Sequence, residues 1–152
     1  MNSSPLHDAR GFTLIEMAVI GAIVSVTTMI AIPSFTQWKA NYQMKQAAME
    51  VVGNLNLARA AAMSRGTGIT VTTALESGRA TLTFGGVFPP VILNEGVANI
   101  TAAAVGFNMF GLRAGGGTVN TQITLTPSQG TAYSVTVTPS GKVDWCAMAS
   151  CS

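Results

Sequence analysis

A long, almost uncharged apolar segment near the N-terminus constrains this chain more than any other feature. The segment from Phe12 to Ile32 holds 21 residues, and Glu16 is its single charged side chain. As a helix it would be about 31 Å long, which matches the roughly 30 Å hydrocarbon core of a membrane. A buried core helix rarely stays uncharged over such a length. The segment therefore predicts a membrane span.

A secretory signal peptide is the alternative, and the residues that flank the segment argue against it. The segment ends in the sequence IPSF at 32–35, which lacks the small residues of a signal cleavage site. The eleven residues before it, MNSSPLHDARG, are polar, and Arg10 stands next to the apolar segment. A cation on that side agrees with the tendency of basic residues to stay in the cytoplasm. We therefore expect the C-terminal domain to lie outside the cytoplasm.

Glu16 is the most informative residue of the segment. A carboxylate deep in a bilayer costs on the order of 3 kcal/mol, and such residues usually have a partner. The segment contains no Lys or Arg. Cleavage between Gly11 and Phe12 would create an α-amino group, which in an assembly could pair with Glu16 of a neighbouring subunit. The simpler alternative is a carboxylate that reaches the membrane surface.

The sequence GFTLIE at 11–16 resembles the processing site of type IV prepilins. The resemblance implies that a prepilin peptidase cuts after Gly11 and methylates the new amine of Phe12. Glu16 would be the fifth residue of the mature chain, a position that registers pilin subunits during assembly. Pro33 would be the twenty-second, where pilins commonly carry a helix-bending proline.

Three further stretches are similar to the GspH/FimT family of minor pilins and pseudopilins. They are LARAAAMSR at 57–65, VGFNMFG at 105–111, after which we expect a strand, and PSGKV at 139–143. The resemblance implies an α+β, pilin-like fold, with a long N-terminal helix packed on a C-terminal antiparallel β-sheet domain. The expected parts are a leader at 1–11, a transmembrane and assembly helix at 12–33, an amphipathic helix at 34–66 and a β-rich domain at 67–152.

The residue pattern after the apolar segment independently predicts one helix followed by strands. Apolar residues recur in steps of four and three along one helix face: Met44, Ala48, Val51, Leu55, Ala58 and Ala62. Gly66 is suited to end this helix in a left-handed conformation. Beyond it, β-branched segments alternate with period two and flank turn residues. They predict two hairpins, 69–73 with 80–84 and 122–126 with 133–138, separated by irregular Gly-rich stretches at 85–90 and 111–117.

Cys146 and Cys151 lie close to the C-terminus with four residues between them. Outside the cytoplasm a disulfide is favoured, and free thiols are the remaining alternative. The spacing does not fit a thioredoxin-like redox pair, and two thiolates without a histidine form only half a zinc site. Pilins commonly close a C-terminal loop with such a bond, so the resemblance agrees. We expect no metal and no cofactor.

DNA uptake is the sharpest binding hypothesis. Some FimT-like minor pilins bind DNA through a C-terminal motif of Gly, a basic residue, any residue and a second basic residue. The matching stretch here is GKVD at 141–144, where Asp144 replaces the second cation and would repel phosphate. Lys142 and Arg113 are candidates for a weak contact, but a net charge of +2 does not argue for a polyanionic partner. Nucleic acid is therefore not the expected partner.

Catalysis is not expected either. His7 is the single histidine and lies in the expected leader, and the chain has no nucleophile elbow, P-loop or paired-carboxylate motif. The resemblance implies a structural minor pilin that passes once through the inner membrane, with its C-terminal domain in the periplasm. It then joins other pilins in a type IV pilus. A pseudopilin of type II secretion is the principal alternative, and a DNA-binding minor pilin of competence is a lesser one.

Overall fold

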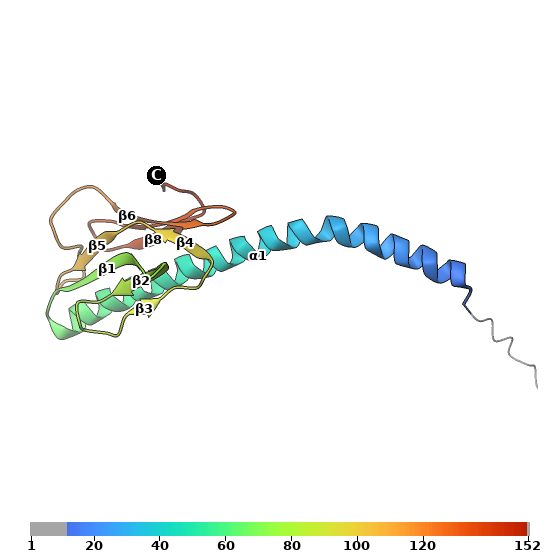
Figure 1. Ribbon diagram of the computed structural model, residues 1–152. Coiled ribbons are helices and arrows are strands. Elements are labelled where there is room, and N and C mark those ends of the chain that lie inside the picture. The colour runs from blue at the N-terminus through green and yellow to red at the C-terminus, as the bar shows by residue number, and fades with distance from the viewer. Residues whose placement is uncertain (1–11, 152) are drawn as a thin grey trace, which may run out of the picture. The chain divides into compact units, whose positions relative to one another are not determined.

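The computed structural model describes residues 12–151, except for the side chains of residues 30–34. The expected leader and Gly11 lie outside the described residues. The chain divides into two compact units, Met1–Thr36 and Gln37–Ser152, which we call the stem unit and the globular unit and describe separately. The helix α1 (Leu14–Arg65) belongs to both, and all the strands, β1 to β8, lie in the globular unit (Figure 1).

The described part of the stem unit is a helix with apolar side chains on all sides. Its hydroxyl groups bond to carbonyl oxygens one turn earlier: Ser25 Oγ donates to the Gly21 carbonyl at 2.7 Å, and Thr28 Oγ1 donates to the Val24 carbonyl at 2.6 Å. Among the described residues, no helix meets both the length and the hydropathy needed to cross a membrane. The membrane span expected at 12–33 is thus not found. Pro33 lies within α1, and the bend expected there stays a prediction because its side chain is not described.

The second half of α1 carries the predicted apolar stripe, and all six of its members are fully buried. Ala47 and Ala61 widen this buried face, because residues three or four apart lie on the same side of a helix. The helix ends at Arg65, and Gly66 follows with a φ of +64°. A left-handed residue at this position is the usual way to terminate a helix, and glycine adopts it without steric strain.

The strands form two antiparallel sheets of four strands each. The first has the order β3-β2-β1-β5, and the second has the order β4-β6-β7-β8. The strand bounds are β1 (Ile69–Glu76), β2 (Arg79–Thr83), β3 (Val91–Ile92), β4 (Val97–Ile100), β5 (Ala103–Phe107), β6 (Thr121–Pro127), β7 (Tyr133–Val137) and β8 (Val143–Cys146). Both predicted hairpins are confirmed, since β1 pairs with β2 and β6 pairs with β7.

A single hydrophobic core joins the two sheets to the buried face of α1. Alternation along β1 points Ile69, Val71 and Thr73 inward, as expected for a strand with one covered face. The buried Thr73 hydroxyl donates to the Thr101 carbonyl at 2.8 Å and accepts from the Ala103 backbone N–H at 3.1 Å. These two bonds satisfy the one polar group that β1 buries, and they connect β1 to Thr101, between β4 and β5, and to the first residue of β5.

No strand follows 105–111 directly, and the next strand, β6, begins at Thr121. The strand β5 instead ends inside this stretch at Phe107, and residues 108–112 form a turn. The physical reason is local. The Asn108 side-chain oxygen accepts the backbone N–H groups of Phe110 and Leu112 at 2.9 and 3.0 Å, and Gly111 has a φ of +72°. An Asn side chain that bonds nearby backbone competes with extended structure and favours a turn.

Candidate functional site

The N-terminal end of α1 holds the residues expected to act in assembly. Thr13 stands before the helix, and its side-chain oxygen accepts the Glu16 backbone N–H at 3.3 Å. In return, Glu16 Oε2 accepts the Thr13 backbone N–H at 3.4 Å. This reciprocal pair is a capping box, which satisfies two donors that a helix start leaves unpaired. The capping box was not predicted from the sequence, although the spacing T-x-x-E before an apolar run is its known signature.

The capping box gives the Glu16 carboxylate hydrogen-bond partners within its own chain. Within one chain its carboxylate lies beside the positive end of the helix dipole and takes two hydrogen-bond donors from Thr13. The charge is therefore accommodated within the chain itself. Phe12 is described and is 74% exposed. The predicted pairing between chains stays a prediction.

The apolar side chains of the stem unit are exposed on every face that the structure describes. Leu14 is 89% exposed and Ile15 is 71% exposed, and the described residues from Met17 to Met29 are exposed as well. A helix that is hydrophobic all round is normally buried in protein or in lipid. The hydroxyl groups of Ser25, Thr27 and Thr28 already bond to their own helix, so burial leaves none of them unpaired. The apolar side chains of the stem unit are therefore suited to burial in protein or in lipid.

The three stretches singled out in the sequence meet at one side chain in the globular unit. Arg59, from the stretch at 57–65, donates through Nε to the Gly111 carbonyl at 2.8 Å. Its Nη2 reaches the Ser140 carbonyl at 3.4 Å. Gly111 and Ser140 belong to the other two stretches, which lie 52 and 81 residues further along the chain. Arg59 therefore connects the end of α1 to the turn after β5 and to the turn between β7 and β8.

Close packing around this guanidinium explains two of the glycines. Gly111 and Gly141 both have positive φ, of +72° and +80°. A Cβ added at Gly111 would press on the side chains of Met63 and Arg59, and one added at Gly141 would overlap the Gly111 carbonyl oxygen. The absence of a side chain therefore lets the two turns approach each other and Arg59.

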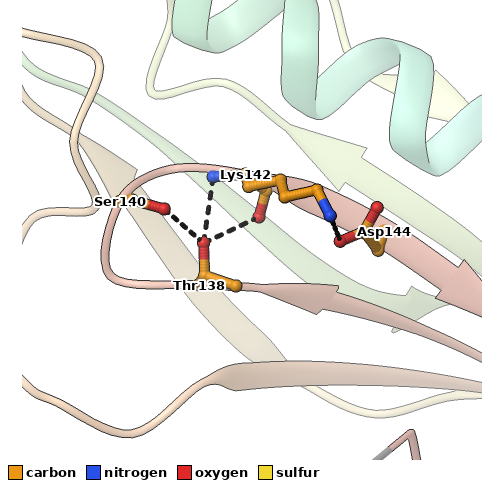
Figure 2. A network of polar contacts seen from close by, with 4 residues as sticks. All are labelled: Thr138, Ser140, Lys142 and Asp144. Atoms are coloured by element: carbon orange, nitrogen blue, oxygen red, sulfur yellow. Dashed lines mark hydrogen bonds and ion pairs between the residues drawn. The ribbon is translucent and has the colours of Figure 1, made fainter.

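The turn between β7 and β8 contains the motif considered for DNA binding, and its polar groups contact one another (Figure 2). Lys142 Nζ forms an ion pair with Asp144 Oδ2 at 2.8 Å, and the Lys142 backbone N–H donates to Thr138 Oγ1 at 3.1 Å. Thr138 and Ser140 share a hydroxyl hydrogen bond of 2.8 Å. Asp144 thus neutralises the cation that would contact a phosphate, and the turn is ordered by its own hydrogen bonds.

Arg113, the second candidate for a DNA contact, is occupied inside its own loop. Its Nη1 donates to Thr121 Oγ1 at 2.9 Å, and its Nη2 donates to the carbonyls of Gly117 and Val119 at 2.8 and 2.7 Å. The side chain is half-buried, and its Nε has no partner. Arg113 therefore organises the Gly-rich loop before β6 and directs its donors inward, whereas phosphate recognition requires donors that point outward.

The predicted disulfide between Cys146 and Cys151 is confirmed. It closes a short tail that follows β8 and lies against the second sheet. The Ala149 carbonyl accepts from Gln122 Nε2 at 3.0 Å and from Thr124 Oγ1 at 3.3 Å, and both of these side chains belong to β6. The tail consequently covers polar side chains on β6, and this placement could not be read from the spacing of the cysteines.

Glu50 is the one described group with a clear electrostatic perturbation. Partial burial against the protein removes water from its carboxylate and raises its pKa above the ordinary value of 4.5. Among the described residues, no group of three His, Cys, Asp or Glu side chains gathers as a metal site would require. The expectation that the chain uses no metal or cofactor stays a prediction.

The comparisons with known proteins concern the fold. No protein-family model matches the sequence, and no curated protein sequence is significantly similar to it. Among solved structures, the chain is similar to the type IV minor pilin FimU of Pseudomonas aeruginosa, with a TM-score of 0.52 and 12% identity. This match covers 68% of the present chain and 87% of FimU. A second crystal form of FimU gives a TM-score of 0.49 at 12% identity, over 66% of this chain and 90% of that one.

At such low identity the likeness establishes architecture and not activity. The architecture agrees with the prediction in its main parts: a long N-terminal helix, whose second half packs on antiparallel β-structure, and a short disulfide loop at the C-terminus. The α+β class predicted from the sequence is confirmed, and the chain has a pilin-like fold.

Proposed function

We propose that this chain is a structural minor pilin of a type IV pilus, of the GspH/FimT kind. The observation that carries the proposal is the stem: an apolar helix exposed on all described faces, with a single carboxylate at its capped N-terminal end. Such a helix is satisfied when it packs among like helices, as the subunits of a filament do. The pilin-like fold of the globular unit supports the same role, and the FimU structure carries the same fold in a protein described as a type IV minor pilin.

The proposed processing follows from the resemblance at 11–16. A prepilin peptidase would cut after Gly11 and methylate Phe12, and the new amine would pair with Glu16 of an adjacent subunit. In this scheme Glu16 changes partners. It leaves the two Thr13 donors that it holds in the free chain and takes a cation from another chain. Because a carboxylate–ammonium pair is stronger than neutral hydrogen bonds, the exchange favours assembly where water is excluded.

We place the protein in the inner membrane before assembly and in the filament afterwards, with the globular unit in the periplasm. This placement rests on the apolar composition of 12–32 and on the leader with Arg10 ahead of it. Alkaline extraction of membranes tests it directly. The unassembled protein should stay in the membrane pellet, and its release into the soluble fraction would contradict the placement.

The central experiment separates the charge of Glu16 from its capping role. Glu16→Gln keeps the ability to cap the helix but removes the charge, whereas Thr13→Val removes the hydroxyl half of the capping box and keeps the charge. We expect Glu16→Gln to be made and processed but absent from sheared filaments, and Thr13→Val to be incorporated. Ser25→Ala is the matched control in the stem, because that hydroxyl bonds only to its own helix. Normal incorporation of Glu16→Gln would overturn the proposed pairing.

A deletion strain distinguishes a pilus subunit from a pseudopilin of type II secretion. Deletion of the gene should reduce the number of surface pili and leave export of folded proteins intact. The reverse outcome would assign the chain to a type II secretion pseudopilus. Both outcomes are compatible with assembly through the stem helix, since pili and pseudopili both assemble through such helices. A DNA receptor role would require a salt-sensitive mobility shift of DNA by the purified full chain.

A further inference from the structure

Four exposed apolar side chains gather where α1 ends and the turn after β5 passes. They are Met63 of α1 and Met109, Phe110 and Leu112 of the turn, and we call them the Phe110 surface. Phe110 is 70% exposed, and the other three are about half exposed. The Met63 side chain lies against Gly111, which makes the helix end and the turn continuous. In Figure 1 the loop that joins β5 to β6 lies at the end of the globular unit where α1 terminates.

The turn that displays Phe110 is held rigidly. The backbone N–H of Asn108 donates to the Leu112 carbonyl at 2.9 Å, and the Gly111 N–H donates to the Asn108 carbonyl at 2.9 Å. The Asn108 side chain takes two more backbone donors, and Arg59 binds the Gly111 carbonyl. A large aromatic side chain on a rigid turn loses little entropy on binding, and preorganised aromatic residues are typical anchors of interfaces.

Two arginines form a positive rim beside the Phe110 surface, and neither belongs to an ion pair among the described residues. Arg59 and Arg113 flank the turn, and both bind carbonyl oxygens, which do not neutralise their charge. Within residues 12–151, the ion pairs are Arg79 with Glu95 and Lys142 with Asp144, and neither involves these two arginines. The chain's own loops occupy the N–H donors of both arginines, so the arginines contribute positive charge but few free hydrogen-bond donors. Such a rim favours a partner with carboxylates around an apolar centre.

We propose that the Phe110 surface docks onto a neighbouring pilin-type subunit, at an apolar patch rimmed by Asp and Glu side chains. The inference rests on the proposed function, because it takes the neighbour to be another subunit of the same filament. Phe110 is the anchor of this contact, and Met63, Met109 and Leu112 exclude water around it. Arg59 is a positioning residue, since it holds the turn and does not itself reach the partner.

The test is site-specific photo-crosslinking in the native cell, with the full chain and its natural partners. Phe110 is replaced by p-benzoylphenylalanine, and the product is identified by mass spectrometry. Ile92, which is 56% exposed on the edge strand β3, receives the same replacement as the matched control. We expect a crosslink from position 110 to one other pilin-type subunit, next to acidic residues, in at least about tenfold higher yield than from position 92.

A second pair of variants measures the contact without a crosslinker. Phe110→Ser should reduce co-purification of that subunit by about tenfold or more, and Ile92→Ser should leave it unchanged. Phe110→Leu, which keeps an apolar side chain, should retain most of the contact. A normal urea unfolding midpoint for Phe110→Ser shows that a loss comes from the surface and not from the fold.

Several outcomes would overturn the inference. They are equal yields from positions 110 and 92, no product from position 110, and a product formed with lipid, nucleic acid or a second copy of this chain. The failure of the proposed function is a separate result. If Glu16→Gln enters filaments normally while the crosslink from position 110 persists, the stem mechanism is wrong and the Phe110 surface stands. If Glu16→Gln is excluded but position 110 gives no crosslink, only the Phe110 surface is wrong.

Discussion

Replacement of Arg59 by Met should destabilise the globular unit by about 2–3 kcal/mol. Met fills a similar volume along the helix but donates no hydrogen bond. The bond from Nε to the carbonyl of the buried Gly111 is 2.8 Å long, and hydrogen bonds from charged groups contribute about 1.5–3 kcal/mol each. The bond from Nη2 to Ser140 is 3.4 Å long and exposed, so it adds only a few tenths of a kcal/mol. The first bond therefore dominates the expected loss.

Equilibrium urea unfolding of the full chain in mild detergent measures this loss. Trp145 reports on the globular unit, because it is half-buried and stacks on Tyr133 with ring centroids 5.8 Å apart. Arg79→Met is the matched control. Its ion pair with Glu95 is 3.5 Å long and largely exposed, so the loss should stay below about 1 kcal/mol. If Arg59→Met and Arg79→Met are equally stable, the claim that Arg59 holds the two turns is refuted.

Three further predictions use the same unfolding assay. Gly141→Ala should lower the free energy of unfolding by about 2–5 kcal/mol, because its Cβ would overlap the Gly111 carbonyl. Gly116→Ala is the control: its Cβ would enter open space, so the loss should be only about 1 kcal/mol. Equal losses for the two variants would contradict the crowding at Gly141. Replacement of Cys146 and Cys151 by Ser should lower stability by about 2 kcal/mol, and an unchanged midpoint in reducing buffer would argue against this contribution. Glu50→Gln should be more stable than the parent at pH 7. Burial raises the Glu50 pKa, so the charged carboxylate opposes folding above that pKa. The stability difference between Glu50→Gln and the parent should therefore vanish as the pH falls below about 4.5. A stability difference that grows on acidification would contradict this direction of the pKa shift.

Periodicity made much of the fold predictable. The stripe from Met44 to Ala62 identified the buried face of α1, because a fixed step of three or four residues leaves one helix face apolar. The hairpins were predictable because β-branched alternation flanked turn residues on both sides. The strands β3, β4 and β8 have two to four residues each, and such short segments carry too little alternation to stand out. They form because neighbouring strands supply hydrogen-bond partners, which a local pattern does not encode.

The candidate site was predictable only in its separate parts. The spacing of Gly11, Phe12 and Glu16 indicated an assembly end, and the cysteine spacing indicated a disulfide. The stretches that contain Arg59, Gly111 and Ser140 were recognisable one by one. Nothing in their spacing indicated that a single guanidinium joins them, because those contacts span 52 and 81 residues.

The sequence by itself determined the apolar stem, its single acidic residue and the change from helical to strand periodicity, since each is a property of neighbouring residues. Only the tertiary structure decided which oxygen atoms the basic side chains contact. It turned Arg113 inward to its own loop, paired Lys142 with Asp144 and placed Arg59 between two turns. The physical reason is that the action of a long basic side chain depends on which oxygen atoms folding brings within hydrogen-bond reach of it, and for Arg59 these atoms lie 52 and 81 residues away along the chain.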